Sequence, residues 1–198
     1  MKNKLNKYNA NFTAGGLLLN EFKAISEILL SDDFLVKLRE EEETNKTIGI
    51  ATMSARKRII AEIKRRYFIA PKGFWNYFVQ WNEHEMKFGL LFLCFKAYPL
   101  ILDIHIEVAL KKFQTGNTLN AYDVQMRLDE IASIDEFVAK WSSQTLEKLN
   151  VQYRKAIKDA GIYDGQNLIK PHRIPSTFWQ YFEEIDESWF LTACFIKN

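Results

Sequence analysis

The feature that most constrains the fold is an apolar run over residues 88–108, FGLLFLCFKAYPLILDIHIEV. It is long enough to resemble a membrane span, but Lys96, Asp103 and His105 interrupt it. A charged side chain near the centre of a bilayer costs about 2.5–3.5 kcal/mol on insertion scales, and Pro99 breaks the run further. We therefore interpret the run as a buried pair of core helices that meet near Pro99, and we expect no membrane partner.

Few residues in this chain break helices, since 8 Gly and 4 Pro stand among 198 residues. A many-stranded sandwich would use Gly, Asn and Pro in turns about every 8 to 12 residues, so their scarcity favours long helices. The 15 Phe, 8 Tyr and 5 Trp supply large rings for a well-packed interior. The composition predicts a mainly α protein built as a compact helical bundle.

The sequence contains no familiar signature of catalysis. Its three histidines, His84, His105 and His172, are scattered, and there is no HExxH, CxxC, EF-hand, phosphate-loop or serine-elbow spacing. We expect Asp103 or His105 to be a satisfied polar group of the core rather than a ligand. The pattern predicts a protein that is not an enzyme and that uses no cofactor and no metal.

The two cysteines, Cys94 and Cys194, lie in apolar surroundings with no partner at metal-ligand or redox spacing. We expect both to be reduced thiols of the core. Because such cysteine usage is typical of reducing compartments, and because the basic start of the chain lacks the apolar segment of a signal peptide, the sequence predicts a cytoplasmic protein.

A basic helix is predicted over residues 52–68, TMSARKRIIAEIKRRYF. Helical spacing of about 100° per residue makes the isoleucines and Tyr67 its buried stripe. The opposite side then presents four cations, which are Lys57, Arg58, Lys64 and Arg65. Such a charge run is often only a solvated face, or it could pair with the acidic residues 40–43, but clustered bases on one helix face also suit several phosphates at once.

The opening helix is predicted to run from Thr13 to Leu30, with Gly15 and Gly16 near its start. Their missing side chains fit either a frayed first turn or a close approach of two backbones. We favour the frayed turn.

The C-terminal part has the element order of a winged helix-turn-helix over residues 121–175: a helix, a short helix, a helix capped by Ser142 or Ser143, and a short β-hairpin at Asp164-Gly165. Lys148, Gln152 and Lys155 are the expected outward groove readers, and Lys170 and Arg173 would lie on the wing. The predicted organisation is a helical bundle over residues 1–118 with a winged-helix-like region over residues 119–198 packed on it, or one continuous domain.

Four segments together resemble the BrxA family of BREX bacteriophage-exclusion systems. They are YNANFTAGGLLL over residues 8–19, SARKRII over residues 54–60, LLFLCFKAYPLILD over residues 90–103 and WSSQTLEKL over residues 141–149. The resemblance implies an all-helical body similar to the RNA-binding factor NusB, a winged-helix-like element, and DNA binding. The resemblance implies that two parts of this chain correspond to the family's basic blocks. They are the helix over residues 142–158 and the residues Arg56, Lys57, Arg58, Lys64 and Arg65.

We therefore predict a non-enzymatic accessory protein of a phage-defence system that contacts the backbone of double-stranded DNA through basic helices. The expected nucleic-acid-binding residues are Arg56, Lys57, Arg58, Lys64, Arg65, Lys148, Gln152, Lys155, Lys170 and Arg173. Two alternatives stay open: a scaffold that binds other BREX proteins, and a NusB-like RNA-binding protein. The oligomeric state does not follow from the sequence.

Overall fold

The structure is a computed structural model and describes residues 6–197, in which helices make up the regular secondary structure and no strand occurs. The N-terminal half consists of η1 (Asn11–Ala14), α1 (Leu19–Ala24), α2 (Ser26–Leu29), α3 (Phe34–Thr44), α4 (Met53–Ile69), α5 (Phe74–Phe78) and α6 (Glu83–Ala97). It is followed by α7 (Pro99–Ile104), the π-helical turn η2 (His105–Leu110), α8 (Lys111–Gln114), α9 (Ala121–Ile134), η3 (Val138–Lys140), α10 (Ser143–Asp159), α11 (Ser176–Glu184) and α12 (Trp189–Ala193).

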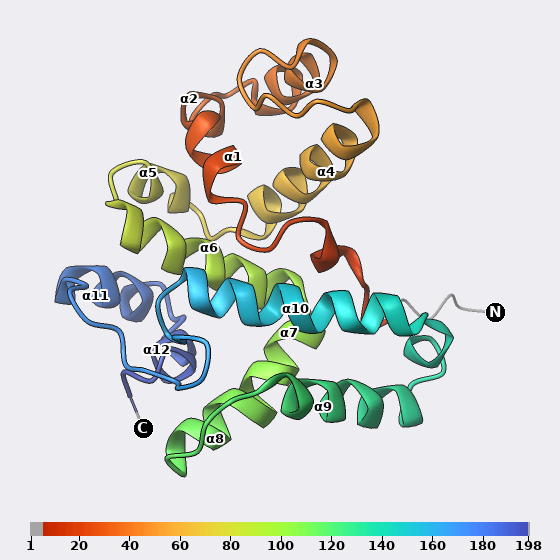
Figure 1. The fold of residues 1–198 in the computed structure, drawn as a ribbon. Coiled ribbons are helices and arrows are strands. Elements are labelled where there is room, and N and C mark those ends of the chain that lie inside the picture. Colours follow the sequence, from red (N-terminus) through yellow and green to blue (C-terminus); the bar gives the residue numbers. More distant parts are fainter. Residues whose placement is uncertain (1–5, 198) are drawn as a thin grey trace.

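Helix α10 crosses the middle of the molecule, with the α1–α4 group above it and α9 below it in the view of Figure 1. It contacts η1, α6 and α9, so the C-terminal part of the chain packs directly on the N-terminal part. The predicted boundary at residues 118 and 119 stays a prediction; residues 1–5 and 198 of the two ranges lie outside the described residues.

The apolar run forms the expected pair of helices. Asn82 caps α6 in a reciprocal capping box with Glu85, and α6 ends at Ala97. Pro99 occupies the first turn of α7, where its missing N–H costs nothing, and α7, η2 and α8 continue to Gln114. The two arms are bent by 107° to each other. Each arm can therefore bury its apolar side chains against different neighbours.

Aromatic rings from distant segments meet around Phe92 of α6, which is fully buried. Its ring centroid lies 4.9 Å from that of Phe182 on α11, 5.3 Å from Phe190 on α12 and 6.1 Å from Phe74 on α5. Large rings bury much apolar area for each ordered side chain. This cluster therefore joins α5 and the C-terminal helices α11 and α12 to α6.

The opening segment differs from the single helix predicted from Thr13 to Leu30. A 3-10 turn, η1, ends at Ala14, and α1 begins only at Leu19. Between them a Cβ on Gly15 would lie 2.2 Å from the side chain of Leu18, and Gly16 has a φ of 60°. The glycines thus lie in a turn between η1 and α1 and leave room for the side chains of Leu18 and Gln152, so they are neither the frayed first turn of a helix nor a contact between two backbones.

The predicted β-hairpin is also absent from residues 6–197. The Asp164-Gly165 turn does form, because the Asp164 carboxylate accepts from the backbone N–H groups of Gln166 and Asn167. Only one isolated bridge follows, between Tyr163 and Leu168. The predicted order of a helix, a short helix and a capped helix is present as α9, η3 and α10, but the predicted hairpin does not form.

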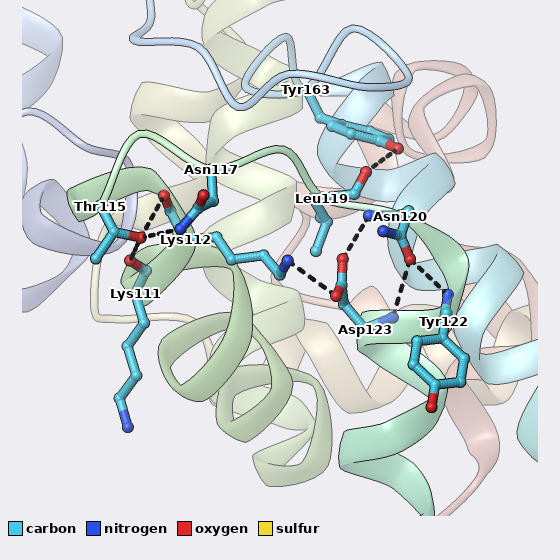
Figure 2. A network of polar contacts seen from close by, with 9 residues as sticks. All are labelled: Lys111, Lys112, Thr115, Asn117, Leu119, Asn120, Tyr122, Asp123 and Tyr163. Carbon is cyan, nitrogen blue, oxygen red and sulfur yellow. Dashed lines mark hydrogen bonds and ion pairs between the residues drawn. The ribbon is translucent and has the colours of Figure 1, made fainter.

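Figure 2 shows what the loop after α10 does instead of forming a wing. The Tyr163 hydroxyl donates to the Leu119 carbonyl at 2.9 Å, and the Leu119 N–H donates to Gln166. The next residue, Asn120, caps α9 in a capping box with Asp123, whose carboxylate is held by Lys112 of α8 at 2.8 Å. The loop after α10 therefore holds the start of α9 in place and does not form a free hairpin.

Candidate nucleic-acid interface

Helix α4 begins where the basic pattern begins, because the Thr52 hydroxyl accepts from the Ala55 N–H at 3.2 Å. Its isoleucines Ile59, Ile60 and Ile63 are buried, as predicted. Four cations of this helix are exposed to solvent: Lys57, Arg58, Lys64 and Arg65. The cationic outer face of the basic helix is therefore present in the folded protein.

Arg56 does not belong to this face, so its place in the expected site needs correction. Its side chain is buried, with 8% of the residue exposed, and its guanidinium lies 3.4 Å from the Ile50 carbonyl. This position is three residues before Ile59 and therefore shares the buried stripe. Arg56 fixes the turn before α4 and presents no free charge to a ligand.

A groove of about 470 Å³ separates α4 from the start of α10. Arg58 and Arg65 line it from α4, and Lys148 lines it from α10. Between the two helices lies η1, which contacts both of them. Thr13 and Asn11 of this turn add polar groups to the lining. The structure thus brings together cations of the two helices that the sequence nominated separately.

The other two expected groove readers of α10 have different surroundings. Gln152 is half-buried, and its side-chain oxygen would lie 3.2 Å from a Cβ on Gly16. Lys155 is exposed, pairs with Asp159 at 2.7 Å and lines a separate hollow of about 300 Å³ beside Leu17. The opening segment therefore lies against this face of α10, which does not present one free row of side chains.

Lys170 and Arg173 are exposed on the segment that follows α10. This segment lies at the C-terminal end of α10, whereas η1 lies near its N-terminal half (Figure 1). Helix α10 has 17 residues, which corresponds to about 25 Å of length. The two wing candidates are therefore remote from the groove.

Lys64 faces a further hollow, between α3 and α4, of about 480 Å³. Its lining is mostly apolar and includes Leu35, Val36 and Ile60. Leu35 and Val36 are 48% and 58% exposed, so an apolar surface remains open to solvent here. A surface of this kind suits a protein more than it suits a polyanion.

Glu62 is the one acid in residues 44–73, which hold eight bases, and it was not among the expected site residues. It is buried, with 3% exposed, and it lies in the lining of the α4–α10 groove. One carboxylate oxygen is 3.5 Å from Nε of Arg65. Burial raises the pKa of Glu62, against the opposing effect of the Arg66 and Arg65 guanidiniums.

The acidic residues 40–43 were a possible internal partner for the basic helix. Within residues 6–197 no ion pair joins them to α4. Instead Glu41 turns inward and accepts from the backbone N–H groups of Thr47 and Ile48 at 2.9 and 2.8 Å. The carboxylate of Glu41 organises the linker before α4, and the exposed cations of α4 form no ion pair with residues 40–43.

His105 is a satisfied core group, as predicted. It is fully buried; Nδ1 lies 3.0 Å from the Tyr153 hydroxyl, and Nε2 lies 2.7 Å from the Ala193 carbonyl. Burial lowers the pKa of His105 to about 4, so the ring is neutral and its Nε2–H donates to Ala193. Cys94 and Cys194 are buried free thiols. Among the described residues no cluster of three or more His, Cys, Asp or Glu side chains could hold a metal ion.

No single helix within residues 6–197 is long and apolar enough to cross a membrane. The bent pair formed by residues 83–97 and 99–114 passes that test by length and composition when its two arms are taken together. Most of the α6 arm is buried in the core.

The fold and the groove define a class: an all-helical protein that carries exposed cations from two helices around one hollow. Comparison with known families makes the assignment specific. Residues 6–186 match the BrxA family, and the chain belongs to that family. It is therefore a component of a BREX defence system, of a family that is generally non-catalytic.

A solved structure has the same fold. It is the crystal structure of an uncharacterized protein from Magnetospirillum magneticum, with a TM-score of 0.71 and 19% sequence identity over 95% of this chain and 97% of the other. At this identity the similarity concerns the fold alone. No curated protein matches the chain.

Proposed function

We propose that this protein is a non-enzymatic, DNA-binding component of its BREX system and that the α4–α10 groove binds the phosphate backbone. Its chemistry is recognition by positive charge, and any covalent step belongs to other proteins of the system. Lys57 and Lys64 extend the cationic face of α4 beside the groove. Lys170 and Arg173, together with Lys155, provide a second contact position.

One observation carries this proposal: Arg58, Arg65 and Lys148 line a single groove although they come from two helices far apart in the sequence. All three side chains are exposed. Guanidinium and ammonium groups that converge on one hollow can neutralise adjacent phosphates, which is the electrostatic basis of backbone binding. Because the net charge of the chain is only +2, the proposal rests on where the bases lie and not on an overall excess of positive charge.

The test is the salt dependence of binding to duplex DNA. Three phosphate contacts predict a slope of log affinity on log salt of about −2.7 from the groove alone. Replacing Arg58, Arg65 and Lys148 together by Ala should flatten the slope by that amount and weaken binding to every sequence alike. Gel shifts over a salt series measure both effects.

A matched control keeps the same change of net charge. Lys37, Lys46 and Lys72 are exposed and lie outside the lining of the groove. Their joint replacement by Ala should leave the slope near that of the wild type. Equal slopes for the two triple variants would contradict a role of the groove. Replacing Lys170 and Arg173 by Ala tests the second position in the same assay.

RNA binding and protein binding are the competing functions. Competition between duplex DNA and structured RNA on the same protein distinguishes the two nucleic acids. Protein binding is favoured by the open apolar hollow beside Leu35 and Val36. If the wild type does not shift DNA but copurifies with other BREX proteins after nuclease treatment, and if Val36→Asp abolishes this copurification, the scaffold function replaces the one proposed here.

A further inference from the structure

Glu62 is an anomaly in a groove that would bind an anion. One of its carboxylate oxygens, Oε2, is buried and has no hydrogen-bond partner. The other, Oε1, lies 3.5 Å from Nε of Arg65. A buried carboxylate oxygen without a partner costs free energy while the group is ionised, so this position favours the neutral, protonated carboxyl.

The groups that face Glu62 come from each element packed around it. Helix α4 contributes Arg65 and Arg66, whose charges both act on the carboxylate, and Arg58 and Lys148 share the groove lining with it. On the core side lies Cys94 of α6, whose pKa is raised by burial and is further affected by Arg66 and Glu62.

Two further neighbours complete this environment. The guanidiniums of Arg65 and Arg66 both lie over the ring of Tyr98, whose hydroxyl is buried without a partner. From η1 the lining receives Asn11 and Thr13, which do not titrate. Glu62 is therefore the one carboxylate in the lining of the groove.

The charge state of Glu62 determines whether its side chain repels a phosphate in the groove. When ionised it only accepts hydrogen bonds, and its negative charge repels the ligand at close range in a poorly solvated position. When protonated it is neutral and no longer repels the phosphates that Arg58, Arg65 and Lys148 would bind. The proton comes from solvent and goes to Oε2, while Oε1 stays available as an acceptor for Arg65.

We propose that binding of a phosphate backbone in the α4–α10 groove is coupled to the uptake of a proton by Glu62. This inference rests on the proposed function and adds a regulation to it: affinity increases as the pH falls. Independently of any ligand, burial already raises the pKa of Glu62, so the carboxyl takes up its proton at a less acidic pH than an exposed glutamate does.

The test measures affinity for a short duplex DNA by fluorescence anisotropy from pH 8 down to pH 5.5 at constant salt. For one coupled proton, affinity should rise by up to about tenfold for each unit of pH over the range in which Glu62 titrates. Glu62→Gln, which is neutral at every pH, should bind more tightly than the wild type at pH 8 and should lose this dependence.

A second measurement needs no variant, so it does not depend on the folding of Glu62→Gln. Calorimetric titration of the wild-type protein with the same DNA in buffers of different ionisation enthalpy gives the number of protons taken up. His84 and His172 are exposed, so they serve as the control. The variant with both histidines replaced by Gln should keep the proton uptake of the wild type.

The outcomes separate the inference from the function. DNA binding with no proton uptake, or with the same pH dependence in Glu62→Gln as in the wild type, overturns the coupling and leaves DNA binding intact. Proton uptake that disappears with the two histidines overturns it as well. If the wild type fails to bind DNA at every pH, both the proposed function and its coupling are wrong.

Discussion

The guanidinium of Arg66 donates a hydrogen bond of 2.6 Å to the carbonyl oxygen of Gly16, fifty residues earlier in the chain. A second bond of 2.8 Å goes to the carbonyl of Leu17. Arg66 is fully buried and comes from the helix that carries the candidate interface. The contact therefore anchors the segment after η1 to α4, and the adjoining η1 residues form part of the groove lining.

Arg66→Met should destabilise the protein strongly. The change keeps an apolar stem but leaves the carbonyls of Gly16 and Leu17 without their donor and removes a cation next to the buried Glu62. Breaking a buried charged network in this way costs about 3–5 kcal/mol. The free energy of unfolding in urea measures the loss. Lys57→Met, on an exposed position of the same helix, should change it by no more than about 0.5 kcal/mol.

Gly89→Ala should also destabilise, although alanine is the better helix former. The change gains about 1 kcal/mol of helix propensity. A Cβ at this position would lie 2.5 Å from a ring carbon of Trp81 and 3.3 Å from Phe74. Overpacking of this kind costs about 1–3 kcal/mol, so the net loss should be about 1 kcal/mol.

Unfolding in the Trp81→Phe background provides the control for Gly89→Ala. The smaller ring vacates the space that the new methyl group needs. There the alanine should be neutral or stabilising, and an equal loss in both backgrounds would show that the ring contact is not the cause.

Local pattern accounts for the parts of this fold that the sequence could predict. The apolar spacing and Ser142 located α10, and the apolar residues Leu149, Tyr153 and Ile157 on the side away from the expected groove readers are buried. Pro99 likewise marked the break between α6 and α7. These signals lie within a few residues of the helix or break that they determine. Each can therefore be recognised from its own segment of the sequence, without knowledge of the rest of the fold.

Contacts across the sequence account for what was missed. A sum of charges treats Arg56 and Arg66 like the other bases of α4, although helical spacing from Ile59 and Ile63 places both on the buried stripe. That spacing was a signal the sequence offered. The use of the loop at Asp164 to hold Leu119, and the meeting of Lys148 with Arg58 in one groove, depend on tertiary packing and have no local signal.

Stability should fall between about pH 6.5 and pH 4 because of His105. Its pKa is near 6.5 in the unfolded chain and about 4 in the folded protein, so below pH 6.5 the unfolded state binds the extra proton. The contribution is lost as the pH falls through this window and amounts to about 3 kcal/mol when complete. Urea unfolding at pH 7 and at pH 4.5 measures it.

His105→Gln isolates this contribution. Glu62 acts with the opposite sign, since its raised pKa makes the folded state bind a proton first as the pH falls. The readout is therefore the difference between the wild type and His105→Gln across the window. A difference that does not change with pH would show that His105 is not the group responsible.

The meeting of Arg58 and Lys148 in one groove predicts that their contributions to DNA binding are not additive. Replacing either residue by Ala removes one of the two cations that would hold the same short stretch of the DNA backbone. The remaining cation can then no longer fix the position of that stretch. A double-mutant cycle on DNA affinity should give a coupling free energy of more than about 0.5 kcal/mol. Arg58 shares the groove with the start of α10, whereas Lys170 follows the end of that helix, so this pair should add within about 0.3–0.5 kcal/mol in the same assay. If the first pair is additive as well, the two cations act on separate parts of the DNA, and the groove is not one binding site.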